Sequence, residues 1–380
     1  MRILYISNSS SISGAPAAML NLVAGLKDRH EIAVVLPDSK GPLYEAISAL
    51  GIRCFTEMPY SLTIWPRVIN PVKYFRRICS LTSGLTKVQA YVADVIDAFS
   101  PDIVHTNVGP LDLALDHCRL RSIPHVWHLR EFQNGMTFWP SDAAFRSRIL
   151  SDGNWNIAIT SCVYDYWGLR EKDTIIYDGV PLPSREVEME TQGGPDFLFV
   201  GRVERNKGLM ELLKAFATYR RKGGKASLDV VGRVSSLYGL LCRMYVNVRG
   251  LRGSVRFHGQ KNDVPGMMRN AKALIVCSQT EGFGLVAVEA MLEGCLVIGN
   301  DTTGIKEQFD IGERFSGGQI GIRYRGSREL AAALKDVDDG KIGDIRMKHR
   351  AAATVRTCYD MSESVSQVEK FYNRILQECR

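Results

Sequence analysis

The chain has 380 residues, of which 45% are hydrophobic and 23% are charged, and its formal net charge is +7. A chain of this length and apolar content can bury a large core and is expected to divide into two domains, which excludes a disordered regulator. The basic residues are not gathered in a nucleic-acid recognition motif, so we expect no nucleic-acid partner.

The cysteines and the apolar runs indicate the compartment. The nine cysteines are scattered without paired spacing, and several lie inside apolar runs. An odd number of mostly buried thiols indicates a reducing compartment and argues against metal ligation. The apolar start at Ile3–Ile6 is too short for a signal peptide, and no stretch approaches the roughly 20 apolar residues that span a bilayer. We expect a cytoplasmic protein without a metal site.

Residues 60–90 interleave basic and apolar side chains. From Val72 onward the two kinds can lie on opposite faces of one helix, a pattern typical of helices at a membrane surface. The same pattern is typical of a core helix with a basic outer face. One interpretation is therefore a peripheral contact with the inner membrane leaflet, and the other is an ordinary amphipathic helix.

The run Ile123–Trp127 is predicted to be a strand. His128 and Arg130 then fall at its carboxyl end, where open α/β sheets place ligands. His128 is a candidate catalytic residue, and the alternative is a packed, hydrogen-bonded histidine. His105, at the end of another predicted strand, competes for a role between the domains.

A break in the pattern follows near residue 181. Pro181-Leu-Pro183 and the polar stretch 186–194 indicate a linker. On either side, short apolar strands alternate with helices of about a dozen residues, the pattern of parallel, doubly wound sheets. We therefore expect an α/β protein with Rossmann-like domains at about 1–185 and 190–362.

The first phosphate-compatible loop lies after the linker. Phe197–Val200 is predicted to be a strand, and Gly201-Arg-Val-Glu-Arg-Asn-Lys-Gly208 leads from it into a helix that begins near Leu209. Arg202 and Lys207 lie on this loop, where two cations could neutralise a leaving pyrophosphate without a metal. The alternative is a solvated basic turn.

The second such loop follows the predicted strand Ala273–Cys277. Glu281-Gly-Phe-Gly284 breaks regular structure, and a helix is predicted from Leu285 to Leu292. Its glycines let the backbone approach a ligand, and the helix N-terminus presents N–H groups to an anion. Glu281 on the loop and Glu289 about two turns later could accept hydrogen bonds from sugar or ribose hydroxyls. The alternative is a capping acid and a solvated acid.

Arg202 and Lys207 followed by Glu281 and Glu289 resemble the motifs of the retaining nucleotide-sugar glycosyltransferases of family 4, which have the GT-B fold. The resemblance runs along nearly the whole chain. Further matching segments are Met1–Ile6, Ser13–Ala15, Asn21–Leu26, His30–Val35, Pro101–Thr106, Asn156–Ser161, Ile175–Val180, Val255–Gln260 and Asp301–Glu307. It implies two doubly wound domains facing across a cleft, an N-terminal acceptor domain and a C-terminal donor domain, with a last helix at about 364–380 returning to the first domain.

The resemblance also implies roles for individual residues. The catalytic candidates are His128, Arg202, Lys207 and Glu281. The donor-binding candidates are Gly14, Arg202, Lys207, Gln260, Lys261, Asp263, Glu281, Phe283, Gly284, Leu285, Val286 and Glu289. The implied reaction moves a sugar, with retention and without a metal or other cofactor, from a nucleotide sugar to a saccharide or lipid-linked acceptor in cell-surface polysaccharide or glycolipid assembly. A UDP-sugar is favoured over a GDP-sugar as donor.

The chain departs from the family pattern at several places. Gly14 is followed by Ala15-Pro16 where relatives carry a second glycine and an acid, and Arg233 stands where many relatives have an acidic turn. Other classes remain open: a GT-B sugar-nucleotide epimerase, and a non-catalytic sugar-nucleotide-binding protein. A Rossmann oxidoreductase is disfavoured because no strand is followed by a clean GxGxxG.

Overall fold

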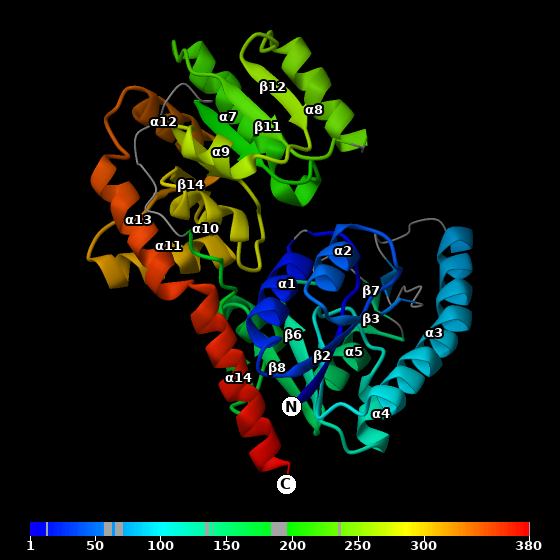
Figure 1. Cartoon of the computed structure of the whole chain (residues 1–380). Helices are drawn as coiled ribbons and strands as arrows, with labels where there is room; N and C mark the ends of the chain where they lie inside the picture. The colour runs from blue at the N-terminus through cyan, green and yellow to red at the C-terminus, as the bar shows by residue number, and fades with distance from the viewer. Residues whose placement is uncertain are drawn as a thin grey trace. The chain divides into compact units, whose positions relative to one another are not determined.

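The computed structural model describes residues 1–12, 14–56, 63–64, 71–133, 137–138, 140–183, 196–234 and 237–379. The chain forms two compact units (Figure 1). Unit 1 is Met1–Pro181 with Met361–Arg380, and unit 2 is Leu182–Asp360. The polar stretch 186–194 lies outside the described residues.

Unit 1 is built on a parallel sheet of seven strands in the order β3-β2-β1-β5-β6-β8-β9. The inner strands are short and almost entirely buried because helices cover both sides of the sheet. Their bounds are β1 Arg2–Ile6, β2 Glu31–Val35, β3 Arg53–Phe55, β5 Ile103–Thr106, β6 His125–Leu129, β8 Asn154–Ala158 and β9 Thr174–Ile175. A separate antiparallel pair joins β4 (Thr63–Ile64) to β7 (Thr137–Phe138).

The helices of unit 1 form two layers. Apolar residues of α1, α2 and α14 pack on one face of the sheet, and those of α3 and α4 pack on the other. The bounds are α1 Ala15–Leu26, α2 Pro42–Ala49, α3 Pro71–Phe99, α4 Leu115–Leu120, α5 Asp142–Ile149, α6 Ser161–Trp167 and α14 Met361–Glu378. The helix predicted from Val72 onward is therefore present as α3.

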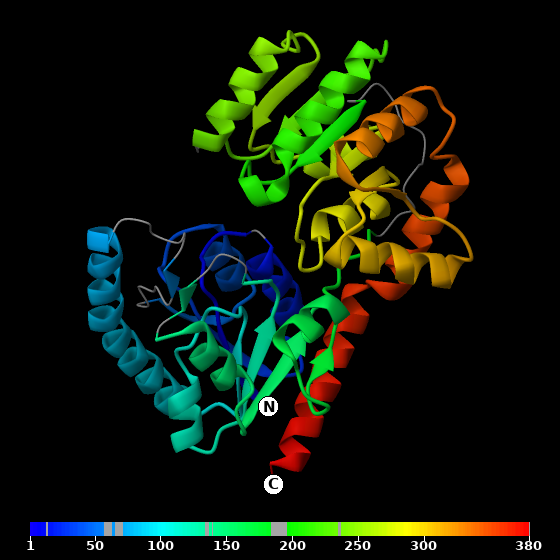
Figure 2. The ribbon, with the colours of Figure 1, turned by 180° about the vertical axis from the view of Figure 1, so that it is seen from behind.

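The last helix, α14, belongs to the core of unit 1. Val368 and Ile375 are fully buried there, and the backbone N–H of Met361 donates to the carbonyl of Val180 over 3.0 Å. A Cβ atom at Gly25 would lie only 2.6 Å from a methyl group of Val365, so α1 and α14 pack in close contact. Figures 1 and 2 show α14 running along the unit 1 strands from both sides.

Unit 2 is a second parallel sheet, of six strands in the order β12-β11-β10-β13-β14-β15. Its strands are β10 Phe197–Val200, β11 Leu228–Val231, β12 Val255–Gly259, β13 Ala273–Val276, β14 Leu296–Asn300 and β15 Ile322–Tyr324. Its helices are the short η1 Arg205–Lys207, then α7 Leu209–Arg221, α8 Leu237–Val248, α9 Val264–Arg269, α10 Leu285–Leu292, α11 Thr303–Ser316, α12 Gly326–Asp338 and α13 Ile345–Cys358. The predicted α/β class with parallel doubly wound sheets is confirmed in both units.

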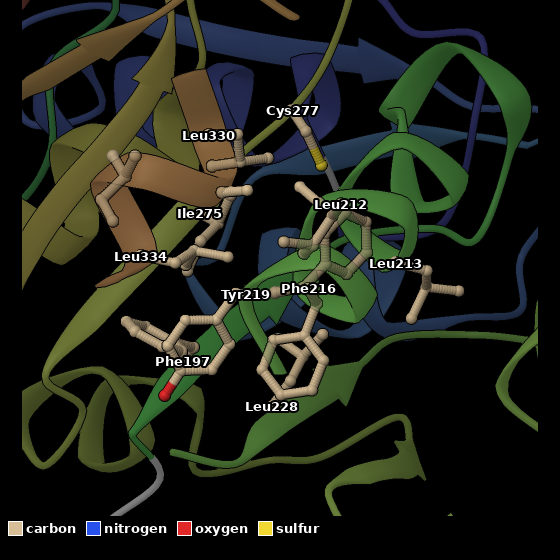
Figure 3. Packing of buried hydrophobic residues seen from close by; sticks show 14 of the residues in the cluster. Phe197, Leu212, Leu213, Phe216, Tyr219, Leu228, Ile275, Cys277, Leu330 and Leu334 are labelled. Carbon is tan, nitrogen blue, oxygen red and sulfur yellow. The ribbon is translucent and has the colours of Figure 1, made fainter. Parts of the chain in front are cut away.

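The core of unit 2 explains the local pattern of its sequence. Phe197 from β10 and Tyr219 from α7 pack edge to face with ring centroids 5.8 Å apart, among apolar side chains of β11, β13 and α12 (Figure 3). Such pairs add stability beyond the area that they bury. Phe197 and Phe199 of the apolar run, and Leu212, Leu213 and Phe216 at their helical spacing, therefore all lie in this core.

Candidate functional site

The order of strands in unit 2 creates a switch point between β10 and β13. Numbered along the chain, the six strands lie in the order 3-2-1-4-5-6. In doubly wound sheets, ligands bind beyond the carboxyl ends of the strands where this order reverses. The two loops that follow β10 and β13, residues 201–208 and 277–284, lie at this point.

Direct contacts hold these two loops side by side. The N–H of Gln279 donates to the carbonyl of Asn206 over 3.2 Å, and the thiol of Cys277 lies 3.3 Å from the carbonyl of Lys207. Gly208 has a φ of +71°, and a Cβ atom there would lie 1.9 Å from the Cys277 carbonyl oxygen. Only glycine permits both this conformation and this approach.

The contact brings together two of the predicted site residues. The Nζ of Lys207 lies 2.7 Å and 3.1 Å from the two carboxylate oxygens of Glu281. Both side chains are largely shielded from solvent, with exposed fractions of 26% and 16%. A cation and a sugar-binding carboxylate candidate, 74 positions apart in the sequence, thus form a single charged pair at the switch point.

Arg202, the other predicted cation, lies differently. Its side chain is exposed and pairs with Glu204 of the same loop over 3.2 Å. The two predicted cations therefore have different partners and exposures: Lys207 pairs with Glu281 and is largely shielded, whereas Arg202 pairs with Glu204 and is exposed. An exposed pair of this kind holds its partners weakly, so Arg202 can turn to another anion at little cost.

The loop that carries Glu281 is braced by α11. The N–H of Glu281 donates to Thr303 Oγ1 over 2.9 Å, and Gln308 Nε2 donates to the carbonyl of Phe283 over 2.8 Å. Thr303 has a φ of +44°, which is rare for a β-branched residue and marks backbone strain. Gly284, with φ +94°, then begins α10 at Leu285.

Two further sets of predicted residues lie on the same unit. The Glu289 side chain, on α10, reaches solvent, yet the protein atoms around it desolvate its carboxylate and raise its pKa to about 7. Gln260 and Lys261 are exposed on the loop after the edge strand β12. Asp263 caps α9 by accepting a 2.9 Å hydrogen bond from the N–H of Gly266, which gives it a structural role.

In unit 1, His128 lies at the carboxyl end of a strand, where it was predicted. It is the last residue but one of β6, which extends to Leu129, and only 1% of its surface is exposed. It lines a small pocket with Asn21, Asp178 and Ser364. His128 is thus a packed and hydrogen-bonded histidine, and a direct role in a reaction stays a prediction.

The partners of His128 determine its protonation. Its Nδ1 lies 3.2 Å from Arg130 Nη2 and 3.2 Å from His105 Nε2. Arginine can only donate, so Nδ1 accepts and the proton of the neutral ring is on Nε2. Burial, with help from the nearby Arg130 charge, holds the pKa of His128 well below its ordinary value. Nε2 has no hydrogen-bond partner among the described residues, so His128 presents a donor.

The same logic extends to a buried chain of polar groups. Since His105 must donate from Nε2, its Nδ1 accepts from the hydroxyl of Tyr372, which lies 2.5 Å away. The Tyr372 hydroxyl in turn accepts from that of Tyr5 over 2.8 Å. Hydrogen bonds therefore run in one direction from Tyr5 through α14 to His128. Arg130 is held by a buried ion pair with Asp178.

Gly14, the remaining predicted donor-binding residue, lies in unit 1 at the N-terminus of α1. It has a φ of +53° and is exposed, and a Cβ atom there would meet no atom within 4 Å. The carbonyl of Ala15, next to it, accepts a 3.0 Å hydrogen bond from Asn107 Nδ2. The glycine thus serves the entry of the chain into α1.

Comparison with known proteins identifies unit 2. Residues 183–341 match the family model described as Glycosyl transferases group 1. This part of the chain is similar to the glycosyl transferases group 1. The match begins near the start of the linker and covers both site loops, so the predicted relationship is confirmed where the motifs lie.

Relatives of known activity share only part of their length with this chain. GDP-mannose:cellobiosyl-diphosphopolyprenol alpha-mannosyltransferase of Xanthomonas oryzae is 30% identical over 129 residues, which are 33% of this chain and 34% of that protein. Glycogen synthase of Mycobacterium tuberculosis is 27% identical over 184 residues, which are 47% of this chain and 42% of that protein. Thus, the chain matches only about a third to two fifths of the length of these two curated relatives.

Solved structures match along the whole chain. HepE of Anabaena in complex with UDP superposes with a TM-score of 0.77 at 18% identity, covering 98% of this chain and 100% of that one. Sucrose-phosphate synthase of Thermosynechococcus elongatus gives 0.73 at 17% identity, covering all of both chains. The fold of the chain is therefore GT-B, as the resemblance implies.

Some site residues of this group 1 domain carried no signal in the sequence. Gln308 and Cys277 hold the loops together, but a glutamine on a helix and a cysteine in an apolar run are typical of many structural positions. Thr303 lies in a segment that the family resemblance marked. Among the helices that the structure describes, none is long and apolar enough to cross a membrane.

Proposed function

We propose that the protein is a retaining glycosyltransferase that moves a sugar from a nucleotide-diphosphate sugar to a saccharide or lipid-linked saccharide. The observation that carries the proposal is the Lys207–Glu281 pair at the switch point of a group 1 domain, beside the N-terminus of α10. Cell-surface polysaccharide or glycolipid assembly is the setting that we propose for this reaction.

The residues of unit 2 suggest how the chemistry proceeds. Cleavage of the anomeric C–O bond places positive charge on the sugar and negative charge on the leaving phosphate. Lys207 and the N–H groups at the start of α10 would stabilise that phosphate more in the transition state than in the ground state. Glu281 would hold the sugar hydroxyls, with Arg202 turning from Glu204 to the diphosphate. The departing phosphate can take the acceptor proton, so we assign no separate base.

Product analysis tests the reaction. We expect the protein, mixed with a donor and acceptor extracts, to release nucleoside diphosphate only when an acceptor is present, apart from slow hydrolysis. The new linkage should keep the anomeric configuration of the donor, which NMR of the product reports. Isomerised nucleotide sugar without acceptor would identify an epimerase instead. Nucleotide binding without turnover, across a broad panel of acceptors, would favour a non-catalytic binding protein.

We propose a UDP-sugar as the donor. HepE, which shares the fold, binds UDP and UDP-glucose, whereas the Xanthomonas relative is named for GDP-mannose. Thermal unfolding with UDP, GDP and ADP separates these donors, because a ligand at 100 times its Kd adds about 2.7 kcal/mol to the apparent stability. A shift with GDP alone would overturn the choice of UDP.

Transfer should not need a metal, because Lys207 and Arg202 supply positive charge at the diphosphate. Activity measured in EDTA should equal activity in magnesium. Loss of transfer in EDTA, with recovery on adding a divalent ion, would show that the cations of the chain do not suffice.

We also propose that the start of α3 contacts the inner membrane leaflet. Val72 and Phe75 are both 67% exposed, beside the exposed cations Arg76 and Arg77, whereas Val92 further along the helix is buried. This is the arrangement of an interfacial helix. Phe75→Glu should reduce sedimentation of the protein with anionic vesicles, and unchanged sedimentation would leave α3 as an ordinary helix. Residues 60–62 and 65–70 of the predicted basic segment lie outside the described residues.

A further inference from the structure

Helix α8 of unit 2 is apolar on two opposite faces. Gly239, Cys242 and Val246 face the core. The other face exposes five large apolar side chains, with exposed fractions of 75% for Leu237, 53% for Leu240, 40% for Leu241, 51% for Met244 and 82% for Val248. Figure 1 places α8 at the edge of unit 2, beside β12.

The exposed side chains form one continuous stripe. Residues of a helix are about 100° apart, so positions 237, 240, 241, 244 and 248 share one side of the cylinder, opposite the three core positions. A helix that is apolar all round is normally buried. A contiguous exposed stripe of this kind marks a surface that another body covers.

The chain segment that contains the stripe is basic. Residues 230–262 contain five arginines and one lysine and no Asp or Glu. Arg243 lies beside the stripe on α8, Arg249 follows directly after the last residue of the helix, and both are exposed. They are held over aromatic rings, Arg243 4.6 Å above Phe257 and Arg249 5.4 Å above Tyr245. The flanking charges are therefore fixed beside the apolar residues.

This combination decides between possible partners. A second copy would bring the same cations against each other, which opposes association. Protein interfaces draw most of their energy from Trp, Tyr and Arg anchors, whereas Leu and Val are under-represented among such anchors. The stripe consists of Leu, Met and Val on a single convex helix, which suits the boundary between headgroups and acyl chains, and the flanking arginines suit anionic headgroups.

We propose that α8 is a membrane-surface element that lies flat on an anionic bilayer, with the stripe from Leu237 to Val248 in the interface and Arg243 and Arg249 on lipid phosphates. The contact is separate from the one at α3, because it is carried by the other unit of the chain. It places the sugar-donor unit itself at the surface where a lipid-linked acceptor would be found.

Vesicle binding by the whole chain tests this proposal. Sedimentation is measured with vesicles of equal parts phosphatidylcholine and phosphatidylglycerol, and with phosphatidylcholine alone. The chain carries Phe75→Glu throughout, so that α3 does not mask the result, and no donor is added, so the result does not depend on glycosyl transfer. We expect binding to the anionic vesicles only, and we expect it to weaken as salt is raised.

Variants then separate the causes. Leu240→Glu with Met244→Glu should abolish the binding, and Arg243→Gln should weaken it about fivefold, the effect of one cation near an anionic surface. The control is Phe315→Glu, which changes a similarly exposed apolar residue elsewhere on unit 2 and should leave binding intact. Thermal unfolding checks that each variant is folded.

Three outcomes would overturn the proposal. The first is equal binding of the α8 double variant and the control. The second is equal binding to neutral vesicles. The third is a concentration-dependent dimer in light scattering that Leu240→Glu with Met244→Glu dissolves without changing vesicle binding, which would assign the stripe to a second copy of the chain.

Discussion

Single side chains at the switch point of unit 2 have unequal roles in the proposed binding of a diphosphate. Lys207→Ala removes a fixed cation and leaves Glu281 without its partner beside the phosphate. Loss of a charge-assisted contact costs about 1.5–3 kcal/mol, so we expect UDP to bind at least tenfold more weakly by calorimetry. Arg202→Ala should cost less, since Arg202 is exposed. Arg205→Ala, an exposed cation on the same loop, is the control. An equal loss in all three variants would contradict a specific role for Lys207.

The raised pKa of Glu289 predicts a pH dependence. Ionised Glu289 would accept the ribose hydroxyls, and its pKa is about 7 because of desolvation. UDP affinity should therefore fall as the pH drops through 7 and Glu289 takes up a proton. Phosphates titrate near this range as well, so Glu289→Gln is the reference, and the pH dependence should be steeper in the unsubstituted protein. The free energy of unfolding should change in the opposite direction. Because the pKa of Glu289 is higher in the folded protein than in the unfolded chain, the folded state is favoured more at low pH, and its stability falls as the pH rises to 7. If the affinity for UDP changed with pH in the same way in the unsubstituted protein and in Glu289→Gln, Glu289 would not be the acceptor of the ribose hydroxyls.

The direction of the buried hydrogen bonds in unit 1 can be tested by deleting single hydroxyls. Tyr372→Phe leaves two buried groups without partners, Nδ1 of His105 and the hydroxyl of Tyr5. Tyr5→Phe leaves only the Tyr372 oxygen without its donor. A buried unsatisfied group costs about 1–3 kcal/mol, so urea unfolding should show the larger loss for Tyr372→Phe. A larger loss of stability for Tyr5→Phe would mean that the hydrogen bonds run in the opposite direction, and the proton of His128 would then be on Nδ1.

At the scale of elements, the approach of the two loops depends on Gly208. In Gly208→Ala the new Cβ atom would meet the Cys277 carbonyl oxygen, so the loops must separate and Lys207 must move from Glu281. Gly223→Ala is the matched control, because Gly223 has a similar φ of +82° but open space around its Cβ position. The free energy of unfolding of the control should fall by about 1 kcal/mol, because alanine is strained at a positive φ. Gly208→Ala should lose more and should also weaken UDP binding. Equal losses of stability in the two variants would mean that the close approach of Gly208 to the Cys277 carbonyl does not contribute to stability.

At the scale of the whole molecule, unit 1 is formed by two separate segments of the chain, whereas unit 2 is formed by one continuous segment. Unit 1 takes its last helix from residues that follow unit 2. Removing residues 361–380 would delete several fully buried apolar side chains, each worth about 1.5–3 kcal/mol, from a unit whose net stability is of the order of 5–15 kcal/mol. We expect the chain 1–360 to lose hydrogen-exchange protection throughout unit 1 and to keep it in unit 2. Removing only residues 377–380, which are exposed where described, should change neither unit. Protection of unit 1 in the chain 1–360 would contradict this.

The sequence by itself determined the elements and the chemistry that they carry. Apolar runs such as Phe197–Val200 and Ala273–Cys277 predict buried strands, and the glycine loops after them predict places where an anion can approach the backbone. These signals are local, since strand periodicity, helix propensity and turn chemistry depend on neighbours along the chain. For this reason the α/β class, the parallel sheets and the Lys207 and Glu281 loops could be predicted from residues that are close in sequence.

Tertiary structure alone decided which of those residues meet. Lys207 and Glu281 pair because β10 and β13 are neighbours in the sheet, an order that no local pattern contains. His128 lies in the core because it belongs to β6, which extends to Leu129. His105 and Arg130 donate hydrogen bonds to its Nδ1, which lowers the free-energy cost of burying its ring. Both faces of α8 carry apolar residues, and only the structure shows that one of them is left uncovered by the residues that it describes. Pairing and exposure depend on contacts between distant segments, and those contacts are set by the fold.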